Sequence, residues 1–293
     1  MTPVVVEVAL NGLTSKARNP HVPIAPDELA RDALACLEAG AAIVHTHVDE
    51  HAPDPARVAA RYLEGWRPVM AARPDAILYP TVGLGGDVHA RYAHEPILAA
   101  AGCARMGVFD PGSVNLGMPV PEGPAALGVT YVNAFDDVRH QNALCLEHRL
   151  GPSISIFEPG FLRTALSYWR AGRLAPGALV KLYFGARESG GPNDHVGFGL
   201  PPTRAALAAY REMLEGCGLP WSVAVLGGDV VASGLARAAL EHGGHVRVGL
   251  EDHAGPRQPT NVELVEEVAA LAAELGRPLA TCADAARILN LPR

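Results

Sequence analysis

The sequence lacks both a long apolar run and a cluster of basic residues. No stretch of about 18 apolar residues occurs in it, so no membrane-spanning helix is predicted. Lys and Arg never cluster beyond a pair, and the formal net charge is -7. The sequence therefore predicts no basic surface that would bind a nucleic acid or an anionic membrane. A small-molecule partner is therefore expected.

Cysteine is scarce, and its spacing carries no motif. The five cysteines lie far apart without a C-x-x-C pair, which argues against a disulfide framework and against a thiolate zinc site. The apolar segment Met1–Leu10 has no basic n-region and no cleavage pattern. We therefore expect reduced thiols and a cytoplasmic protein.

No linker or shift in composition divides the chain, so residues 1–293 are predicted to form a single catalytic domain. The Gly- and Pro-rich stretch Gly185–Pro202 is interpreted as a long loop between a strand and a helix. No G-x-G-x-x-G motif opens the first helical segment, which disfavours a doubly wound sheet, the competing architecture.

What the sequence does contain is an alternation of short β-branched runs with longer Ala- and Leu-rich stretches, typical of a parallel sheet with crossover helices. The predicted helices include Pro26–Ala39, Pro55–Arg73, Pro202–Gly216 and Asn261–Leu275. The predicted strands are Val4–Leu10, Ile43–Val48, Ala76–Thr81, Arg105–Val108, Thr130–Asn133, Ile154–Phe157, Val180–Phe184, Ser222–Leu226 and Val246–Leu250. About 250 residues suffice for a (β/α)8 barrel, so we predict this α/β fold, with either Arg105–Val108 or Thr130–Asn133 as an insertion.

Two histidines on the second predicted strand form a candidate metal site. His45 and His47 are separated by one residue, and alternate side chains of a strand share a face, so one metal ion can bind both. The pair lies near the C-terminal end of the strand, where barrel enzymes place their active sites. Two imidazoles in a barrel interior would otherwise be a costly polar burial.

A carboxylate near the last predicted strand completes this site. Strand alternation places Arg247, Gly249 and Glu251 on one face, with Glu251 at the C-terminal mouth of the barrel. Two imidazoles and one carboxylate leave an open coordination position, and this donor set favours Zn²⁺ over Mg²⁺ or Ca²⁺. Asp252, beside Glu251, can pair with Arg247 and is a candidate catalytic base.

A glycine turn is a candidate phosphate site. Gly227 and Gly228 follow the predicted strand Ser222–Leu226 and precede a helical stretch. Exposed backbone N–H groups in such a turn can hold a phosphate, although an ordinary turn explains the same residues.

Several motifs together resemble a known enzyme family. They are H-T-H on the second strand, the P-T-x-G stretch Pro80–Gly83, the segment Gly199–Thr203, Trp221 and, most specific, the block Gly243–Asp252, continued by Asn261, Gly276–Pro278 and Ala280–Thr281. With them the chain resembles the β-keto acid cleavage enzyme family from about Val4 to Arg293.

The resemblance implies a (β/α)8 barrel with zinc bound by His45, His47 and Glu251. It implies a reaction in which a β-keto acid and acetyl-CoA give acetoacetate and a new acyl-CoA. Zinc would hold the keto acid and stabilise its enolate, and Asp252, oriented by Arg247, would handle the proton. The glycine turn would then be the expected contact with CoA, and a homo-oligomer is expected, because such barrels often form symmetric assemblies.

Three positions depart from the family pattern and bear on the substrate. Thr14 stands where a member that acts on an amino-keto acid has an acidic residue, so an amine-bearing substrate is not favoured. Ser155 aligns with a family carboxylate on the fifth core strand, and Glu158 stands where the family often has Asp. Either Glu158 takes over part of that role or the pocket differs, and a plain loop carboxylate is an equal alternative. Together with Thr81 of the P-T-x-G stretch, these residues are the expected substrate contacts.

Two other functions fit part of the pattern. A metal-dependent hydrolase on the same fold also uses H-x-H, but its pair usually ends the first strand and is followed by a bridging lysine. Here the pair lies on the second strand, and Lys181 is the only lysine at a predicted strand. A non-catalytic barrel that binds a metabolite or a structural metal is the third possibility. The sequence does not identify the keto acid, because selectivity resides in loops such as Thr14–Ile24 and Gly185–Leu200.

Overall fold

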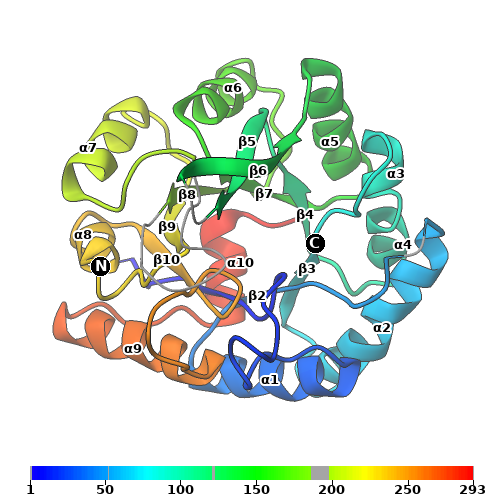
Figure 1. Cartoon of the computed structure of the whole chain (residues 1–293), viewed down its shortest axis with the longest axis horizontal. Helices are drawn as coiled ribbons and strands as arrows, with labels where there is room; N and C mark the ends of the chain where they lie inside the picture. Colours follow the sequence, from blue (N-terminus) through cyan, green and yellow to red (C-terminus); the bar gives the residue numbers. More distant parts are fainter. Residues whose placement is uncertain (1, 52, 121–122, 186–197, 293) are drawn as a thin grey trace.

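Eight parallel strands form a ring surrounded by helices in the computed structural model, which describes residues 2–51, 53–120, 123–185 and 198–292 (Figure 1). Neighbouring strands are hydrogen-bonded in the order β3-β2-β1-β10-β9-β8-β7-β4. The two ends of this sheet meet where Leu78 pairs with Ala104, and the Arg105 N–H donates to the Leu78 carbonyl over 3.1 Å. The ring is therefore nearly closed, and the predicted (β/α)8 fold is confirmed.

The barrel strands are short, and a helix or helix pair crosses over between most of them. The strands are β1 (Val6–Ala9), β2 (Ile43–Thr46), β3 (Ile77–Pro80), β4 (Met106–Phe109), β7 (Gly151–Ile156), β8 (Leu179–Gly185), β9 (Trp221–Leu226) and β10 (His245–Val248). The helices are α1 (Pro26–Ala39), α2 (Pro55–Ala72), α3 (Val88–Tyr92), α4 (Glu95–Ala100), α5 (Phe135–Glu147), α6 (Pro159–Arg170), α7 (Arg204–Met213), α8 (Leu235–Glu241), α9 (Asn261–Glu274) and α10 (Cys282–Leu289). No helix in the described part of the chain combines the length and the hydropathy needed to span a bilayer. Most of the predicted loop Gly185–Pro202, residues 186–197, lies outside the described residues.

The ninth predicted strand belongs to an insertion. Thr130–Asn133 overlaps the end of β6 (Gly123–Tyr131), which pairs antiparallel with β5 (Val114–Val120). This hairpin follows β4 and lies in front of the ring in Figure 1, at the C-terminal end of the barrel strands. The sequence does not predict β5, because Gly117 and Pro119 interrupt its apolar run.

Local capping sets the helix boundaries. The Thr260 hydroxyl accepts a hydrogen bond from the Glu263 N–H over 3.1 Å, and the Glu263 carboxylate accepts one from the Thr260 N–H over 2.7 Å, which fixes the start of α9. The predicted helix Pro202–Gly216 is shorter in the structure, because the Thr203 hydroxyl caps α7 by accepting a hydrogen bond from the Ala206 N–H.

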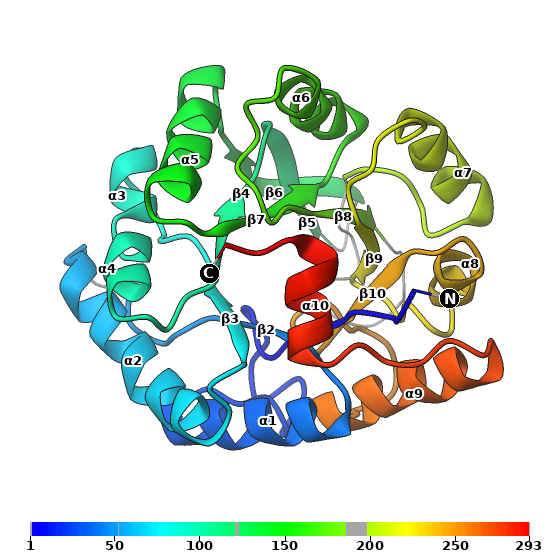
Figure 2. The same cartoon turned by 180° about the vertical axis from the view of Figure 1, so that it is seen from behind.

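Helix α10 covers the end of the barrel opposite the hairpin. Figure 2 shows α10 across the centre of the ring on that face. Leu289 and Leu291 are buried there, and a Cβ added to Gly151, at the start of β7, would lie 2.3 Å from the Leu291 side chain. Packing therefore fills the N-terminal end, and the C-terminal end carries the polar groups described next.

Candidate active site

Three side chains from distant parts of the sequence converge at the C-terminal end of the barrel. His45 lies on β2, His47 follows that strand, and Glu251 follows β10. The His45 Nε2 lies 3.3 Å from the Glu251 Oε2, and the His47 Nε2 lies 3.4 Å from the Glu251 Oε1. One ligand atom from each residue lies within 4.8 Å of the other two. The structure thus brings together the three residues that the sequence proposes as metal ligands.

The chemistry of this trio fits a metal ion. The His47 Nε2 and the Glu251 Oε2 are buried and have no hydrogen-bond partner in the described part of the chain. Burial holds the pKa of His45 well below its ordinary value, so its ring is neutral, which is the form that binds metals. That ring stacks on Tyr79 with centroids 4.4 Å apart, and its Nδ1 lies 3.3 Å from the Tyr79 carbonyl oxygen, which leaves Nε2 for a metal.

A turn, and not strand alternation, places Glu251. The strand β10 ends at Val248, and Gly249 has a φ of +137°. A Cβ on Gly249 would lie 2.0 Å from the Ala9 carbonyl oxygen, so only glycine fits this close approach. The Glu251 N–H then donates to the Ala9 carbonyl over 3.2 Å. The sequence-based placement of Glu251 on a continuous strand was therefore wrong, although its predicted position at the barrel mouth is observed.

Asp252 is held by a buried arginine. The Arg247 Nε donates to the Asp252 Oδ2 over 2.7 Å, and the Arg247 Nη2 donates to the Asp252 Oδ1 over 3.0 Å. The same guanidinium lies 3.0 Å from the Glu251 Oε1. This bidentate hydrogen bonding fixes the plane of the Asp252 carboxylate.

The two adjacent carboxylates differ in basicity. Burial raises the pKa of Asp252, and Arg247 only partly opposes the rise. Burial also acts on Glu251, but there the charge of Arg247, together with the contacts to the His47 and His45 rings, prevails and holds its pKa well below the ordinary value. Glu251 is therefore suited to remain an anionic ligand, and Asp252 is suited to exchange a proton.

The sequence did not predict the buried hydrogen-bond network that lies beneath this site. The Arg247 Nη1 donates to the Glu7 Oε1 over 2.9 Å and to the Tyr79 hydroxyl over 3.1 Å. The Tyr79 hydroxyl donates to Glu7 and accepts a hydrogen bond from the Lys181 Nζ over 3.0 Å. The signal for Glu7 was present as a single charged residue in the apolar run around β1. The network fixes Arg247 from the side opposite Asp252.

The sequence also did not predict a second buried carboxylate, Asp110. It follows β4, and its Oδ2 accepts a hydrogen bond from the Tyr131 hydroxyl over 2.6 Å. Burial raises the pKa of Asp110, and the Tyr131 and Ser155 hydroxyls oppose the rise. A carboxylate therefore lies beside Ser155, but it comes from the neighbouring strand.

The other expected substrate contacts are Thr14, Thr81 and Glu158, and each is hydrogen-bonded to a different segment of the chain. The Thr14 hydroxyl donates to the Leu250 carbonyl over 2.7 Å, directly before Glu251. The Thr81 N–H donates to the Tyr62 hydroxyl over 3.2 Å at the end of β3. Glu158 accepts a hydrogen bond from the Gly199 N–H over 2.8 Å and, within the described part of the chain, bonds to no member of the metal trio. This contact favours the loop interpretation of Glu158.

The glycine turn is hydrogen-bonded to the segment around Asp252. The Gly227 N–H donates to the Asp252 carbonyl over 2.9 Å, and the Gly228 carbonyl accepts a hydrogen bond from the Ala254 N–H over 2.9 Å. The Asp229 carboxylate accepts hydrogen bonds from the Val231 and Ala232 N–H groups, so these two donors are already paired. The turn therefore supports the backbone around Asp252, and its contact with CoA stays a prediction.

Comparison with known proteins points to one family. The family model of the beta-keto acid cleavage enzyme matches residues 3–291. A 3-oxoadipate:acetyl-CoA acetyltransferase of Cupriavidus necator is 32% identical over 99% of this chain and 95% of its own length. A 3-keto-5-aminohexanoate cleavage enzyme of Fusobacterium nucleatum is 28% identical over the full length of both chains. Among solved structures, ObcA bound to oxaloacetate is similar with a TM-score of 0.70 and 20% identity, over 95% of this chain and 69% of that one, which supports the barrel fold.

Proposed function

The chain belongs to the beta-keto acid cleavage enzyme family, and we propose that it condenses a β-keto acid with acetyl-CoA and releases acetoacetate and a new acyl-CoA. The observation that carries this proposal is the Arg247–Asp252 pair beside the trio His45, His47 and Glu251. It combines a positioned base with a metal-type donor set at the active-site end of a barrel. The name of the Cupriavidus necator relative supports acetyl-CoA as the second substrate.

We further propose that His45, His47 and Glu251 hold a zinc ion. Two imidazoles and one carboxylate suit zinc and leave a position open for substrate. When bound, zinc would polarise the keto acid's oxygens and stabilise negative charge that develops on them.

The protein's own residues then account for the proton transfers. Asp252 takes a proton from the carbon between the keto and carboxylate groups, while Arg247 keeps its carboxylate oriented. The resulting carbanion attacks the acetyl thioester, and the CoA thiolate leaves. That thiolate attacks the original keto carbon, the bond to the former methylene carbon breaks, and Asp252 returns its proton to acetoacetate. Atoms and protons balance, because the acyl group and the acetyl group exchange partners.

A panel of β-keto acids tests the reaction class. Each acid is incubated with the enzyme and acetyl-CoA, and acetoacetate and the new acyl-CoA are quantified together. We expect equal amounts of the two products and none without acetyl-CoA. Turnover that needs water but not CoA would contradict the proposal and favour a hydrolase.

Metal analysis tests the proposed ligands. The purified protein is expected to contain about one zinc per chain by elemental analysis, and His45→Ala and Glu251→Ala are each expected to remove most of it, because three protein ligands define the site. His51→Ala, a change at an exposed histidine four residues after His47, is the control and should retain the metal. Full activity of metal-free protein would refute the zinc proposal.

A further inference from the structure

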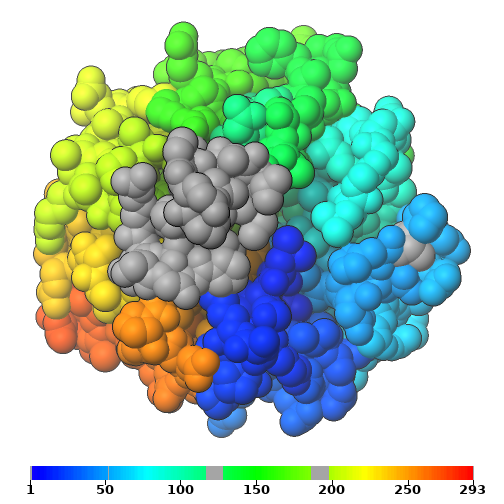
Figure 3. Space-filling view, viewed as in Figure 1, coloured from blue at the N-terminus to red at the C-terminus, as the bar shows by residue number. Residues whose placement is uncertain are grey.

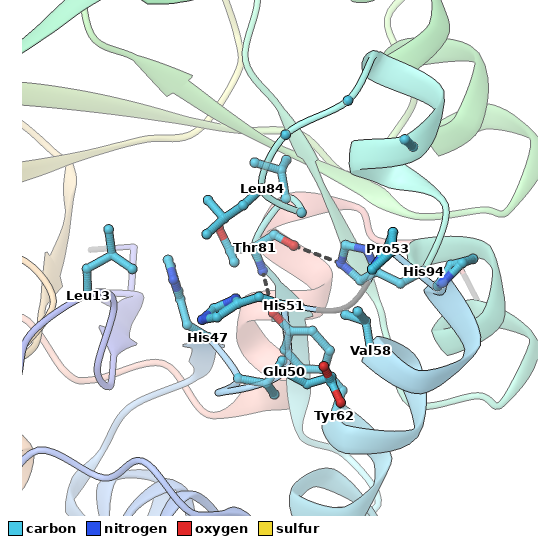
Figure 4. A pocket seen from close by; sticks show the side chains of 17 residues that line it. Leu13, His47, Glu50, His51, Pro53, Val58, Tyr62, Thr81, Leu84 and His94 are labelled. Carbon is cyan, nitrogen blue, oxygen red and sulfur yellow. Dashed lines mark hydrogen bonds between the residues drawn. The ribbon is translucent and has the colours of Figure 1, made fainter. Parts of the chain in front are cut away.

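A cavity of about 200 Å³ lies beside the metal trio, between the segments that follow β2 and β3 (Figure 4). His47 forms part of its wall, and Thr81 lies at the start of the β3 segment. The lining segments are neighbours on the face of the molecule shown in Figure 3, where the residues after β1 are dark blue and those after β3 are cyan. A group that extends from the trio along the His47 side would enter this cavity.

The walls of the cavity are mostly apolar. Val48, Val58 and Val82 line it, and two leucines, Leu13 and Leu84, stand at its edge. Leu13 is 79% exposed and Leu84 is 67% exposed, so both side chains are accessible to a ligand at the edge of the cavity. An apolar ligand would cover both of them.

Three of the residues that line the cavity, Tyr62, Thr81 and His94, are bonded to one another. The Tyr62 hydroxyl donates to the Thr46 carbonyl over 3.3 Å and accepts a hydrogen bond from the Thr81 N–H over 3.2 Å. The His94 Nε2 lies 2.8 Å from the Thr81 carbonyl oxygen, and its ring stacks on Tyr62 with centroids 5.6 Å apart. Burial lowers the pKa of His94 to about 4, so the ring is neutral. A ligand with many polar groups would find few partners here.

Imidazoles, those of His47, His51 and His94, are the basic side chains that line the cavity in the described part of the chain. No Lys or Arg lines it within the described residues, and its one carboxylate, Glu50, forms an ion pair with Arg57 over 2.8 Å. A carboxylate that entered the cavity would lose its hydration without gaining a Lys or Arg as partner.

We propose that this cavity binds the side chain of the β-keto acid and selects a neutral, apolar chain. The inference rests on the proposed function and narrows its substrate class. The pantetheine arm of CoA fits the cavity less well, because its two amides need hydrogen-bond partners, and the groups of Tyr62, Thr81 and His94 are already bonded to one another. The predicted substrate thus differs in charge from the 3-oxoadipate named for the Cupriavidus necator relative.

Two substrates of equal size and branching test the selection. The neutral 6-methyl-3-oxoheptanoate and the acidic 3-oxoadipate are compared by kcat/KM at saturating acetyl-CoA, with acetoacetate as the shared product. We expect the neutral acid to be preferred by about 100-fold or more, because only the acidic chain carries a charge into the cavity. Equal or higher kcat/KM for 3-oxoadipate would overturn the inference and leave the proposed function standing. If neither acid, nor any other, yields acetoacetate, the proposed function itself fails.

A variant at the cavity edge supplies the second test. Leu84→Arg adds a cation at an exposed position, so folding should be retained, and the preference for the neutral acid should fall about 10-fold or more. Leu146→Arg, the same change at a 49% exposed leucine on α5, is the matched control and should leave the preference unchanged. An effect of Leu84→Arg on the KM of acetyl-CoA alone would assign the cavity to CoA and refute the proposal.

Discussion

At the scale of single residues, the site depends on two adjacent carboxylates in different surroundings. Glu251 lies between Arg247 and two imidazoles, whereas the Asp252 carboxylate contacts Arg247 alone among these groups. This difference fits the proposed roles, metal binding for Glu251 and proton transfer for Asp252. Neighbours in the sequence can differ in this way because a turn points their side chains in different directions.

Asp252→Asn separates the two roles. The amide keeps the size of the side chain but cannot take a proton, so kcat should fall by about 10²–10⁴-fold, while the zinc content stays unchanged. Both are measured on the same preparation, by acetoacetate release and elemental analysis. Asp75→Asn, at a partly exposed carboxylate paired with Arg73, is the control and should change neither. Unchanged turnover in Asp252→Asn would assign the base to another residue.

Sequence spacing predicted part of this site and missed the rest for a physical reason. The H-x-H spacing and the Arg247–Asp252 neighbourhood are local patterns, so the sequence displays them directly. Glu7 and Asp110 reach their partners only through strand pairing and the inserted hairpin, which bring residues far apart in sequence together. No local pattern could therefore have placed them.

At the scale of elements, periodicity identified every barrel strand but not the irregular segments. The alternation of β-branched and Ala-rich stretches depends on burial, which the barrel imposes repeatedly. The end of β10 at Gly249 and the hairpin of β5 and β6 depend instead on a close backbone approach and on long-range pairing. These irregular segments lie at the C-terminal end of the barrel, where the proposed site is.

The capping box of α9 is one element whose stability contribution can be tested. Thr260→Ala removes the hydroxyl that accepts the Glu263 N–H, so the free energy of unfolding should fall by about 1 kcal/mol. Thr164→Ala, inside α6, is the matched control, because its hydroxyl donates to the Gly160 carbonyl of the same helix and caps no helix end, and Ala favours a helix. Urea unfolding of both variants measures the difference. Equal stabilities would show that the cap does not stabilise the fold.

At the scale of the whole molecule, the two ends of the barrel differ. The N-terminal end is filled by apolar packing, and buried charged residues lie inside the ring toward the C-terminal end. Helix α10 fills the N-terminal end, and charged residues such as Glu7, Lys181 and Arg247 are buried inside the ring below the site. Each of these charges is paired, as burial requires. That the chain is one catalytic domain in a cytoplasmic homo-oligomer stays a prediction.

The buried His245 at the start of β10 gives the molecule a testable pH dependence. It is 2% exposed, and its Nδ1 accepts a hydrogen bond from the Val5 N–H over 3.0 Å. Burial, assisted by the charge of Arg277, lowers the pKa of His245 from 6.5 to about 4. Between pH 4 and pH 6.5, His245 therefore binds a proton in the unfolded chain but not in the folded chain. This residue therefore reduces stability as the pH falls from 6.5 toward 4.

His245→Asn isolates this contribution, because the Asn Oδ1 can accept the same hydrogen bond without titrating. Between pH 7.5 and 4, wild-type protein should lose about 3 kcal/mol more unfolding free energy than the variant, because the pKa of His245 is lowered from 6.5 to about 4 on folding. The exposed His242→Asn is the control and should follow wild-type protein, because water surrounds that ring in both states. Urea unfolding at several pH values measures the difference, and parallel curves for wild type and His245→Asn would show that His245 is protonated without cost in the folded barrel.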